Sequence, residues 1–215
     1  MRISVFVFII SFLAISCNRH DETTDEKTTQ VVQPDTVVTP SYTDLIIAHR
    51  NKTDLDMTNG DHSPIEPDSL ATFKGLNYFP ISEYWNVRAS YTIIDTGTVF
   101  NLPTTTDRVI PMKKHGLIIF THQNKEVKLF AYTYIEHPDE DLFVPFLDAT
   151  NGDLTYVGGR YVEVKYPDHD SVWVDFNKAY SPYCAYYHHY SYPIPPLENT
   201  LAITIDAGEK VLYNY

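Results

Sequence analysis

The sequence has few cysteines, few glycines and few basic residues, and each shortage excludes a class of protein. Two cysteines in 215 residues cannot form a disulfide framework. Eight glycines exclude a collagen-like chain, while 43% hydrophobic and 14% aromatic residues exclude a disordered one. Lys and Arg number 16 against 28 Asp and Glu, which gives a formal net charge of −12. A chain this acidic lacks the basic face that nucleic acid requires, so we expect no nucleic-acid partner.

Long hydrophobic runs are also scarce, and the longest lies at the N-terminus. Residues 3–15 are mostly apolar and follow Arg2, but a membrane span needs roughly 20 such residues. This pattern predicts a signal peptide over residues 1–16. The run ends in Ala-Ile-Ser-Cys at residues 14–17, which resembles the lipobox of bacterial lipoproteins, where the cysteine carries lipid. The alternative is an ordinary signal peptide that is cleaved nearby.

The resemblance to lipoproteins implies a place in the cell and an organisation of the chain. We expect Cys17 to be lipidated and to anchor the protein to the bacterial cell envelope, at the outer membrane, on its periplasmic or surface side. Residues 17–40 are polar and acidic, and they predict a flexible tether. Residues 41–215 then form a single β-rich domain. The sequence leaves its oligomeric state open.

The domain shows the period of strands rather than of helices. Hydrophobic residues alternate with polar ones from residue 87, and runs at 117–122 and 126–134 flank a predicted hairpin turn at 123–125. Short helical segments are expected only near Ser41, a potential N-cap, and Pro67. Because no helix-length pattern separates the strands, the sequence predicts an all-β fold, a single antiparallel β-barrel or β-sandwich.

Residues 180–199 interrupt the β pattern. They read YSPYCAYYHHYSYPIPPLEN, with six tyrosines, four prolines and two histidines. Prolines at this density exclude a helix or a central strand. The segment therefore predicts a long ordered loop, rich in rigid aromatic side chains, that forms the wall of a site or an interface.

Seven phrases along the domain resemble a known family. The family is called domain of unknown function 1684, whose bacterial members have no established activity, and the resemblance spans about residues 73–210. Members of the family often have Asn at the position of Ser181 and a second Cys at the position of Tyr192. A disulfide or metal site built on two cysteines is thus not available here in the same way. The phrases are FKGLNYFP at 73–80, LFVPFLDAT at 142–150, GRY at 159–161, DFNKAY at 175–180, PYCAY at 182–186, PPLEN at 195–199 and AGEK at 207–210.

Polar residues beside the long loop mark a candidate ligand site. Arg160 and Asp175 lie in or next to apolar strands, where a buried charge needs a partner. We expect either an Arg160–Asp175 pair on the floor of a pocket or a structural ion pair that fixes the loop. The predicted function is the binding of a small polar or carbohydrate-like molecule. The predicted ligand-binding residues are Arg160, Tyr161, Asp175, Asn177, Tyr180, Tyr186, Glu198 and Asn199.

Two alternative functions remain open. A hydrolase would use Asp175, Cys184 or Glu198, for example Cys184 as a thiol nucleophile beside a histidine. For Cys184 the sequence favours the alternative, a small buried hydrophobic residue. The protein could instead be a structural or assembly component of the envelope, with the tyrosine-rich loop as its interface. The histidines lack metal-ligand spacing, so we expect no metal and no cofactor.

Overall fold

A curled antiparallel sheet of seven strands forms the centre of the domain. The structure is a computed structural model that describes residues 39–59, 63–94, 96–138 and 140–212. The predicted signal peptide, the predicted lipidation site Cys17 and the predicted tether as far as residue 38 lie outside these residues. The helices are α1 (Tyr42–Thr58), α2 (Pro67–Leu70), η1 (Glu83–Trp85), η2 (Phe176–Lys178), η3 (Tyr183–Ala185) and η4 (Leu197–Asn199). The strands are β1 (Asn86–Ile93), β2 (Val99–Pro103), β3 (Val109–His122), β4 (Lys125–Tyr134), β5 (Leu142–Phe146), β6 (Arg160–Val164) and β7 (Ser171–Asp175).

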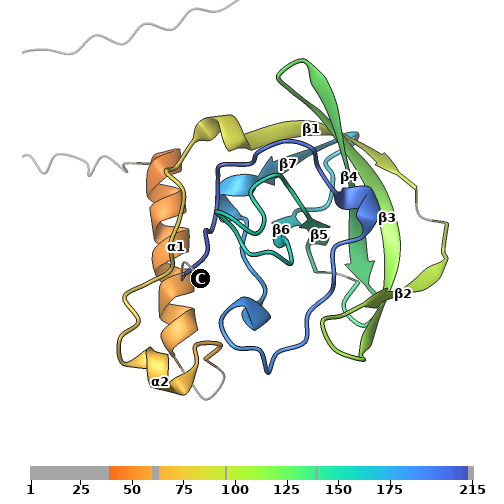
Figure 1. Ribbon diagram of the computed structural model, residues 1–215. Helices are drawn as coiled ribbons and strands as arrows, with labels where there is room; N and C mark the ends of the chain where they lie inside the picture. Colours follow the sequence, from red (N-terminus) through yellow and green to blue (C-terminus); the bar gives the residue numbers. More distant parts are fainter. Residues whose placement is uncertain (1–38, 60–62, 95, 139, 213–215) are drawn as a thin grey trace, which may run out of the picture. The chain divides into compact units, whose positions relative to one another are not determined.

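The strand order makes this sheet a half-barrel. Its path is β6-β5-β4-β3-β1-β7, with β2 paired to the first five residues of β3, and neighbouring strands in this sheet are antiparallel. The two ends of the path, β6 and β7, approach each other as the sheet curls (Figure 1). The all-β prediction is therefore confirmed, and the sheet is an open half-barrel with few short helices.

The β3–β4 hairpin shows how the sequence sets the register. Gln123 and Asn124 form its turn, and both have positive φ (48° and 61°), as the tight turn of a two-residue hairpin requires. Further along the hairpin, β3 has an irregularity between Lys114 and Gly116. A Cβ at Gly116 would lie 2.2 Å from the ring of Tyr91, so glycine allows this ring to lie directly on the strand.

The main hydrophobic core fills the concave side of the half-barrel. Inward residues of β1, β3, β4, β5, β6 and β7 meet there. The C-terminal segment adds Leu201, Ile205 and Ala207 to the same core, so it covers the side that the strands leave open. Burial of these apolar side chains is the main stabilising contribution to the fold.

Helix α1 lies at one side of the half-barrel (Figure 1). Ser41 and Asp44 form a capping box at its start, as the sequence suggested, but the helix runs for 17 residues and is longer than the short segment expected. Only Ile46 and Met57 of α1 are buried. The Tyr42 hydroxyl donates a hydrogen bond of 2.7 Å to Asp175 at the end of β7, which attaches the helix to the sheet. No helix in the described residues has the length and hydropathy of a membrane span.

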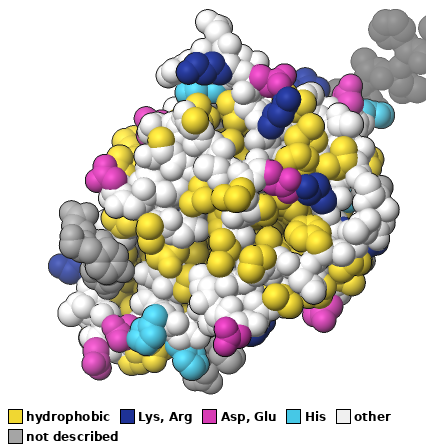
Figure 2. Space-filling model, turned by 45° about the vertical axis from the view of Figure 1, so that its right-hand side comes forward, with side chains coloured by type: hydrophobic (Ala, Val, Ile, Leu, Met, Phe, Trp, Pro, Cys, Tyr) yellow, Lys and Arg dark blue, Asp and Glu magenta, His cyan; other side chains and the backbone are white. Residues whose placement is uncertain are grey.

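The surface is of mixed character. In Figure 2, hydrophobic side chains occupy much of the middle of one face, and many of the charged side chains lie nearer its rim. The chain has two tryptophans of opposite exposure: Trp85 is 3% exposed in the core, whereas Trp173 is 59% exposed on β7.

Candidate functional site

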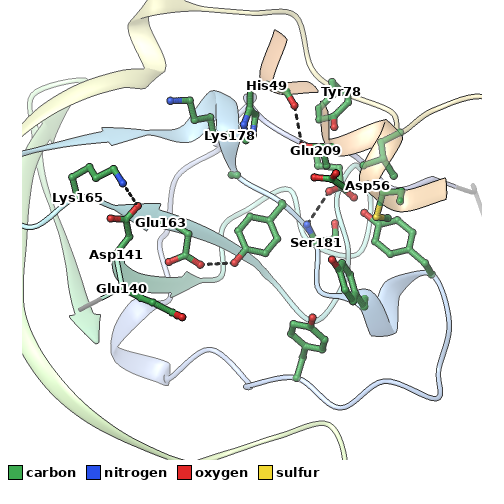
Figure 3. Close-up of a pocket in the computed structure, with 18 of the residues that line it drawn as sticks. His49, Asp56, Tyr78, Glu140, Asp141, Glu163, Lys165, Lys178, Ser181 and Glu209 are labelled. Atoms are coloured by element: carbon green, nitrogen blue, oxygen red, sulfur yellow. Dashed lines mark hydrogen bonds and ion pairs between the residues drawn. The ribbon is translucent and has the colours of Figure 1, made fainter. Parts of the chain in front are cut away.

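A cavity of about 860 Å³ lies between α1, strand β6 and residues 178–192 (Figure 3). Helix α1 contributes His49, Thr53 and Met57, and β6 contributes Glu163. The C-terminal segment contributes Glu209. A volume of roughly 300–1,000 Å³ is typical of small-molecule sites. The cavity is therefore large enough for a ligand of several ring units.

Tyrosine is the most frequent residue type in the lining of this cavity. The tyrosines of residues 178–192 are held by proline turns: η3 begins after Pro182, whose carbonyl accepts a hydrogen bond of 2.8 Å from the Ala185 N–H. The Tyr183 ring packs against Tyr190 and Tyr192, each at 5.5 Å between ring centroids. Mutual packing of this kind fixes the orientation of the rings. The tyrosines that line the cavity are Tyr78, Tyr134, Tyr180, Tyr183, Tyr186 and Tyr192.

Glu209 is the most deeply buried acid of the cavity, with 2% of its side chain exposed. Its position depends on Gly208, which has φ +75° and passes so close to Ala179 that a Cβ would lie 2.5 Å from the Ala179 carbonyl. Glu209 Oε2 accepts a hydrogen bond of 3.1 Å from the Ser181 N–H. Burial raises the pKa of Glu209 to about 8, although Ser181 and the Arg160 guanidinium both favour the charged form. At neutral pH this carboxyl therefore carries a proton.

Three buried polar atoms of the cavity lining have no hydrogen-bond partner among the described residues. They are Glu209 Oε1, Ser181 Oγ and Tyr186 Oη. The Ser181 hydroxyl is near the Glu209 carboxyl, but no hydrogen bond of acceptable geometry joins them. The same three side chains also line a void of about 10 Å³ behind the cavity. An unsatisfied buried polar group costs roughly 1–3 kcal/mol, so three in one place mark a site where a polar ligand or water gains binding energy.

A second carboxyl, Glu163, lies nearer the mouth of the cavity. Its Oε1 accepts a hydrogen bond of 2.5 Å from the Tyr180 hydroxyl. Burial among its neighbours raises the pKa of Glu163 to about 7, and the charges of Asp141 and Glu140 raise it further, while the Tyr180 hydrogen bond opposes them. Glu163 is itself an exposed residue, so solvent screens part of this effect. In both carboxyls of the cavity the surroundings favour the neutral form, a kind of pKa shift that is common at functional sites.

The comparisons with known proteins agree with the sequence resemblance. The model of the family described as protein of unknown function (DUF1684) matches residues 71–210. The chain belongs to this family. Among solved structures, an uncharacterized protein of Haloarcula marismortui with a solution NMR structure is 35% identical to this chain, with a TM-score of 0.64. The match covers 77% of this chain and 92% of the Haloarcula chain. No curated protein matches the chain.

Arg160 of the DUF1684 domain has a different partner from the one expected. Its guanidinium is fully buried and lies 3.3 Å from Asp148, whereas Asp175 has other partners. It also donates hydrogen bonds to the carbonyls of Ile205 (2.9 Å), Ala207 (2.5 Å) and Glu209 (3.2 Å). The expected Arg160–Asp175 pair is therefore wrong. The structure places Arg160 beneath the C-terminal segment. Its guanidinium donates there to backbone carbonyls that, in a regular sheet, would accept hydrogen bonds from a neighbouring strand.

Asp175 and Asn177 form a separate cluster at the N-terminal end of α1. Asp175 accepts a hydrogen bond from Tyr42 and lies 3.3 Å from the Lys178 ammonium. The Asn177 side chain is fully buried and donates 2.8 and 2.9 Å hydrogen bonds to the Ser82 carbonyl and the Tyr42 hydroxyl. In the DUF1684 domain these two residues hold α1 against the sheet, and neither lines the tyrosine cavity.

Tyr161 and Asn199, two other predicted ligand-binding residues, have structural partners. The buried Tyr161 hydroxyl donates to the Pro193 carbonyl. Asn199 is fully buried, accepts a hydrogen bond of 2.7 Å from the Phe130 N–H and donates to the Phe130 and Pro145 carbonyls. Asn199 therefore bridges β4 and β5.

The three predicted catalytic candidates lie in separate surroundings. Glu198 pairs with Lys114 at 2.6 Å and accepts a hydrogen bond of 2.6 Å from Tyr132. Cys184 is half-buried, with its Sγ 3.7 Å from the Tyr156 hydroxyl. Asp175 belongs to the cluster at the N-terminal end of α1. The structure does not bring these three groups together. Within the described residues, no group of three or more His, Cys, Asp or Glu is placed to hold a metal ion.

Of the predicted ligand-binding residues, Tyr180 and Tyr186 line the tyrosine cavity. Sequence reasoning missed Glu163, Ser181 and Glu209. Glu163 occupies an outward position of an alternating strand, where a charged residue is expected to be solvated. Glu209 follows a glycine in the AGEK phrase, and only the fold brings it to Ser181, 28 residues earlier in the chain. The one local signal in the sequence for this contact was the glycine at position 208, a residue type that permits positive φ and a close approach of the backbone.

Proposed function

We propose that this DUF1684 protein binds a small polyhydroxylated, carbohydrate-like molecule in the tyrosine cavity. The observation that carries the proposal is the convergence of three unpartnered buried polar atoms, on Glu209, Ser181 and Tyr186, in a cavity lined by six tyrosines. A ligand with several hydroxyl groups would satisfy these atoms. Its ring faces would lie against aromatic side chains.

The protonation of Glu209 favours a neutral ligand over a charged one. A carboxyl that keeps its proton at neutral pH offers one donor and one acceptor, which suits a sugar hydroxyl. Positive charge on the cavity lining is limited, because Lys165 lies 2.8 Å from Asp141 and Lys178 pairs with Asp175. An anionic ligand would thus meet few uncompensated cations, while a hydroxylated one meets tyrosine hydroxyls and carboxyls throughout.

The experiment is a thermal-shift and calorimetric screen of the full chain, purified in mild detergent. The probes are glucose, galactose, mannose and N-acetylglucosamine, each as the monosaccharide and the β-1,4-linked disaccharide. A probe that binds the native state raises the unfolding temperature with concentration. We expect one sugar series to do so, and we expect Glu209→Leu, which removes both the donor and the acceptor of the carboxyl, and Tyr183→Ala to remove most of the shift.

Matched controls are Glu126→Leu, on the exposed β3–β4 hairpin, and Tyr84→Ala, an exposed tyrosine away from the cavity. Both should retain the shift of the wild-type protein. The proposal is wrong if no sugar binds, or if the shift survives in both Glu209→Leu and Tyr183→Ala.

We further propose that the protein is a lipid-anchored protein of the bacterial cell envelope. The support is the lipobox-like sequence at residues 14–17 and the acidic tether that follows it. Metabolic labelling with palmitate and membrane fractionation test this directly. The wild-type chain should incorporate label and sediment with membranes, whereas Cys17→Ser should do neither. Equal labelling of both would contradict lipidation at Cys17.

A further inference from the structure

A second cavity of about 700 Å³ adjoins the tyrosine cavity. It lies between the first half of α1 and the outer face of β7, with Tyr42, Leu45 and Trp173 in its lining. Six residues line both cavities, so the two adjoin, and we call them together the cleft. The shared residues are His49, Asp141, Glu163, Lys165, Lys178 and Tyr180.

The boundary between the two parts is polar. The Tyr180 hydroxyl and the Glu163 carboxyl meet there, and the Lys178 ammonium lies beside Asp175. Figure 3 shows Glu163, Lys165 and Lys178 on the side of the cavity away from Glu209. A ligand that continues from one part into the other would therefore pass hydrogen-bonding groups rather than an apolar barrier.

Trp173 gives the second part its main feature. Its indole is 59% exposed on the outer face of β7, opposite Arg88 in the register of β1. Leu45 of α1, which lines the same part of the cleft, is also exposed. An exposed indole in the lining of a cleft offers a flat apolar ring to a ligand, and tryptophan is enriched at binding surfaces for this reason. A flat indole beside carboxyl and amide groups matches the apolar face and hydroxyl edge of a sugar ring.

We propose that the cleft binds a linear oligosaccharide, with one end in the tyrosine cavity and later units stacked on Trp173. This inference rests on the proposed function and adds ligand length to it. The tyrosine cavity fixes the terminal units through Glu209 and Ser181. The exposed indole adds affinity only for chains long enough to pass the Tyr180–Glu163 boundary.

The experiment compares short and long probes on the full chain by titration calorimetry and tryptophan fluorescence. The pairs are cellobiose with cellohexaose, chitobiose with chitohexaose, and mannobiose with mannohexaose. For the sugar that binds, we expect the six-unit probe to bind about tenfold more tightly than the two-unit probe, a difference of about 1.4 kcal/mol. Because Trp85 is buried, the change in fluorescence on binding the six-unit probe should come from Trp173.

Trp173→Ala should reduce the affinity for the six-unit probe to that of the two-unit probe and leave the two-unit probe unaffected. Ile93→Ala, an exposed residue of β1 that lines neither part of the cleft, is the matched control and should change neither affinity. Equal affinity for both lengths, or a length effect that survives in Trp173→Ala, overturns this inference while the proposed function stands. Absence of binding by every sugar overturns both.

Discussion

Tyr180 and Glu163 are joined by a hydrogen bond of 2.5 Å at the boundary between the two parts of the cleft. The backbone of Tyr180 is held at the same place, because it exchanges two hydrogen bonds of 2.9 Å with Tyr161 at the start of β6. The hydroxyl therefore approaches the carboxyl from a fixed position. This contact opposes the rise that burial causes in the pKa of Glu163, and the first prediction rests on it.

Tyr180→Phe should raise the pKa of Glu163 above its present value of about 7. The Tyr180 hydroxyl stabilises the charged carboxylate, and its removal leaves burial and the neighbouring acids to favour the neutral form. Carbon-13 NMR titration of the glutamate side chains measures this directly. Asp141→Asn supplies a comparison of opposite sign, since loss of its negative charge should lower the same pKa. An unchanged Glu163 titration in Tyr180→Phe would show that the hydrogen bond is not formed.

Glu209→Gln should change how stability depends on pH. The pKa of Glu209 is about 8 in the folded protein against an ordinary value of 4.5, so the folded state keeps a proton that the unfolded chain releases. This group therefore makes the free energy of unfolding fall as pH rises from about 4.5 to about 8, by up to roughly 1.4 kcal/mol per pH unit. Glutamine removes that contribution and keeps an acceptor for the Ser181 N–H.

Urea unfolding at several pH values between 5 and 8 provides the measurement. The curve of Glu209→Gln should be flatter than that of the wild-type protein, with the larger difference at pH 8. Glu126→Gln, on the exposed hairpin, should retain the wild-type slope. Identical slopes for Glu209→Gln and the wild-type protein would mean that Glu209 is already ionised in the folded state.

Arg160→Met should destabilise the protein by about 3–5 kcal/mol, because it leaves the buried Asp148 carboxylate without its cation. It also leaves three buried carbonyls of the C-terminal segment without their donor. Arg160→Lys should recover little, since an ammonium cannot bridge the carboxylate and several carbonyls in one plane. Denaturant unfolding monitored by circular dichroism tests both variants. Near-native stability combined with lost sugar binding would instead place Arg160 in the ligand site.

Tyr42→Phe should loosen α1. It removes the donor to Asp175 and the acceptor for Asn177, and hydrogen bonds to charged groups contribute roughly 1.5–3 kcal/mol. Hydrogen exchange should therefore become faster in Tyr42–Thr58 than in the strands. Tyr84→Phe serves as the control, because its hydroxyl contacts His122 on the far end of β3. Unchanged protection of α1 in Tyr42→Phe would show that Ile46 and Met57 hold the helix by themselves.

The fold class was predictable because it depends on local patterns. Alternation along β1, the turn at Gln123–Asn124 and the absence of helix-length periods all report on the backbone of their own segments. The length of α1 was not predictable in this way, because its exposed face carries Leu45, Ile47 and Leu55, and the apolar residues do not form one clear stripe. Packing at two buried positions and the Tyr42 hydrogen bond extend a helix that its sequence specifies weakly.

The site was predictable in outline only. The tyrosine-rich segment does form a wall of the cavity, and Tyr180 and Tyr186 lie in it. The acids were not predictable, since Asp148 rather than Asp175 reaches Arg160, and Glu209 rather than Glu198 reaches the cavity. Which acid reaches Arg160 or the cavity depends on how distant segments cross in space. The sequence immediately around these acids does not distinguish one from another.

The C-terminal segment that carries Glu209 has a further consequence for how this family can diversify. Arg160 and Asp148 hold this segment by side-chain contacts between residues 205 and 209, and isolated backbone hydrogen bonds to residues 77–79 and Ala179 hold residues 208–210. A strand in a full ladder can shift only by whole register steps, each of which turns its side chains to the opposite face. A segment held at separate points can change its path by single substitutions between those points. Such substitutions can therefore reshape this edge of the cavity while the half-barrel beneath it stays the same.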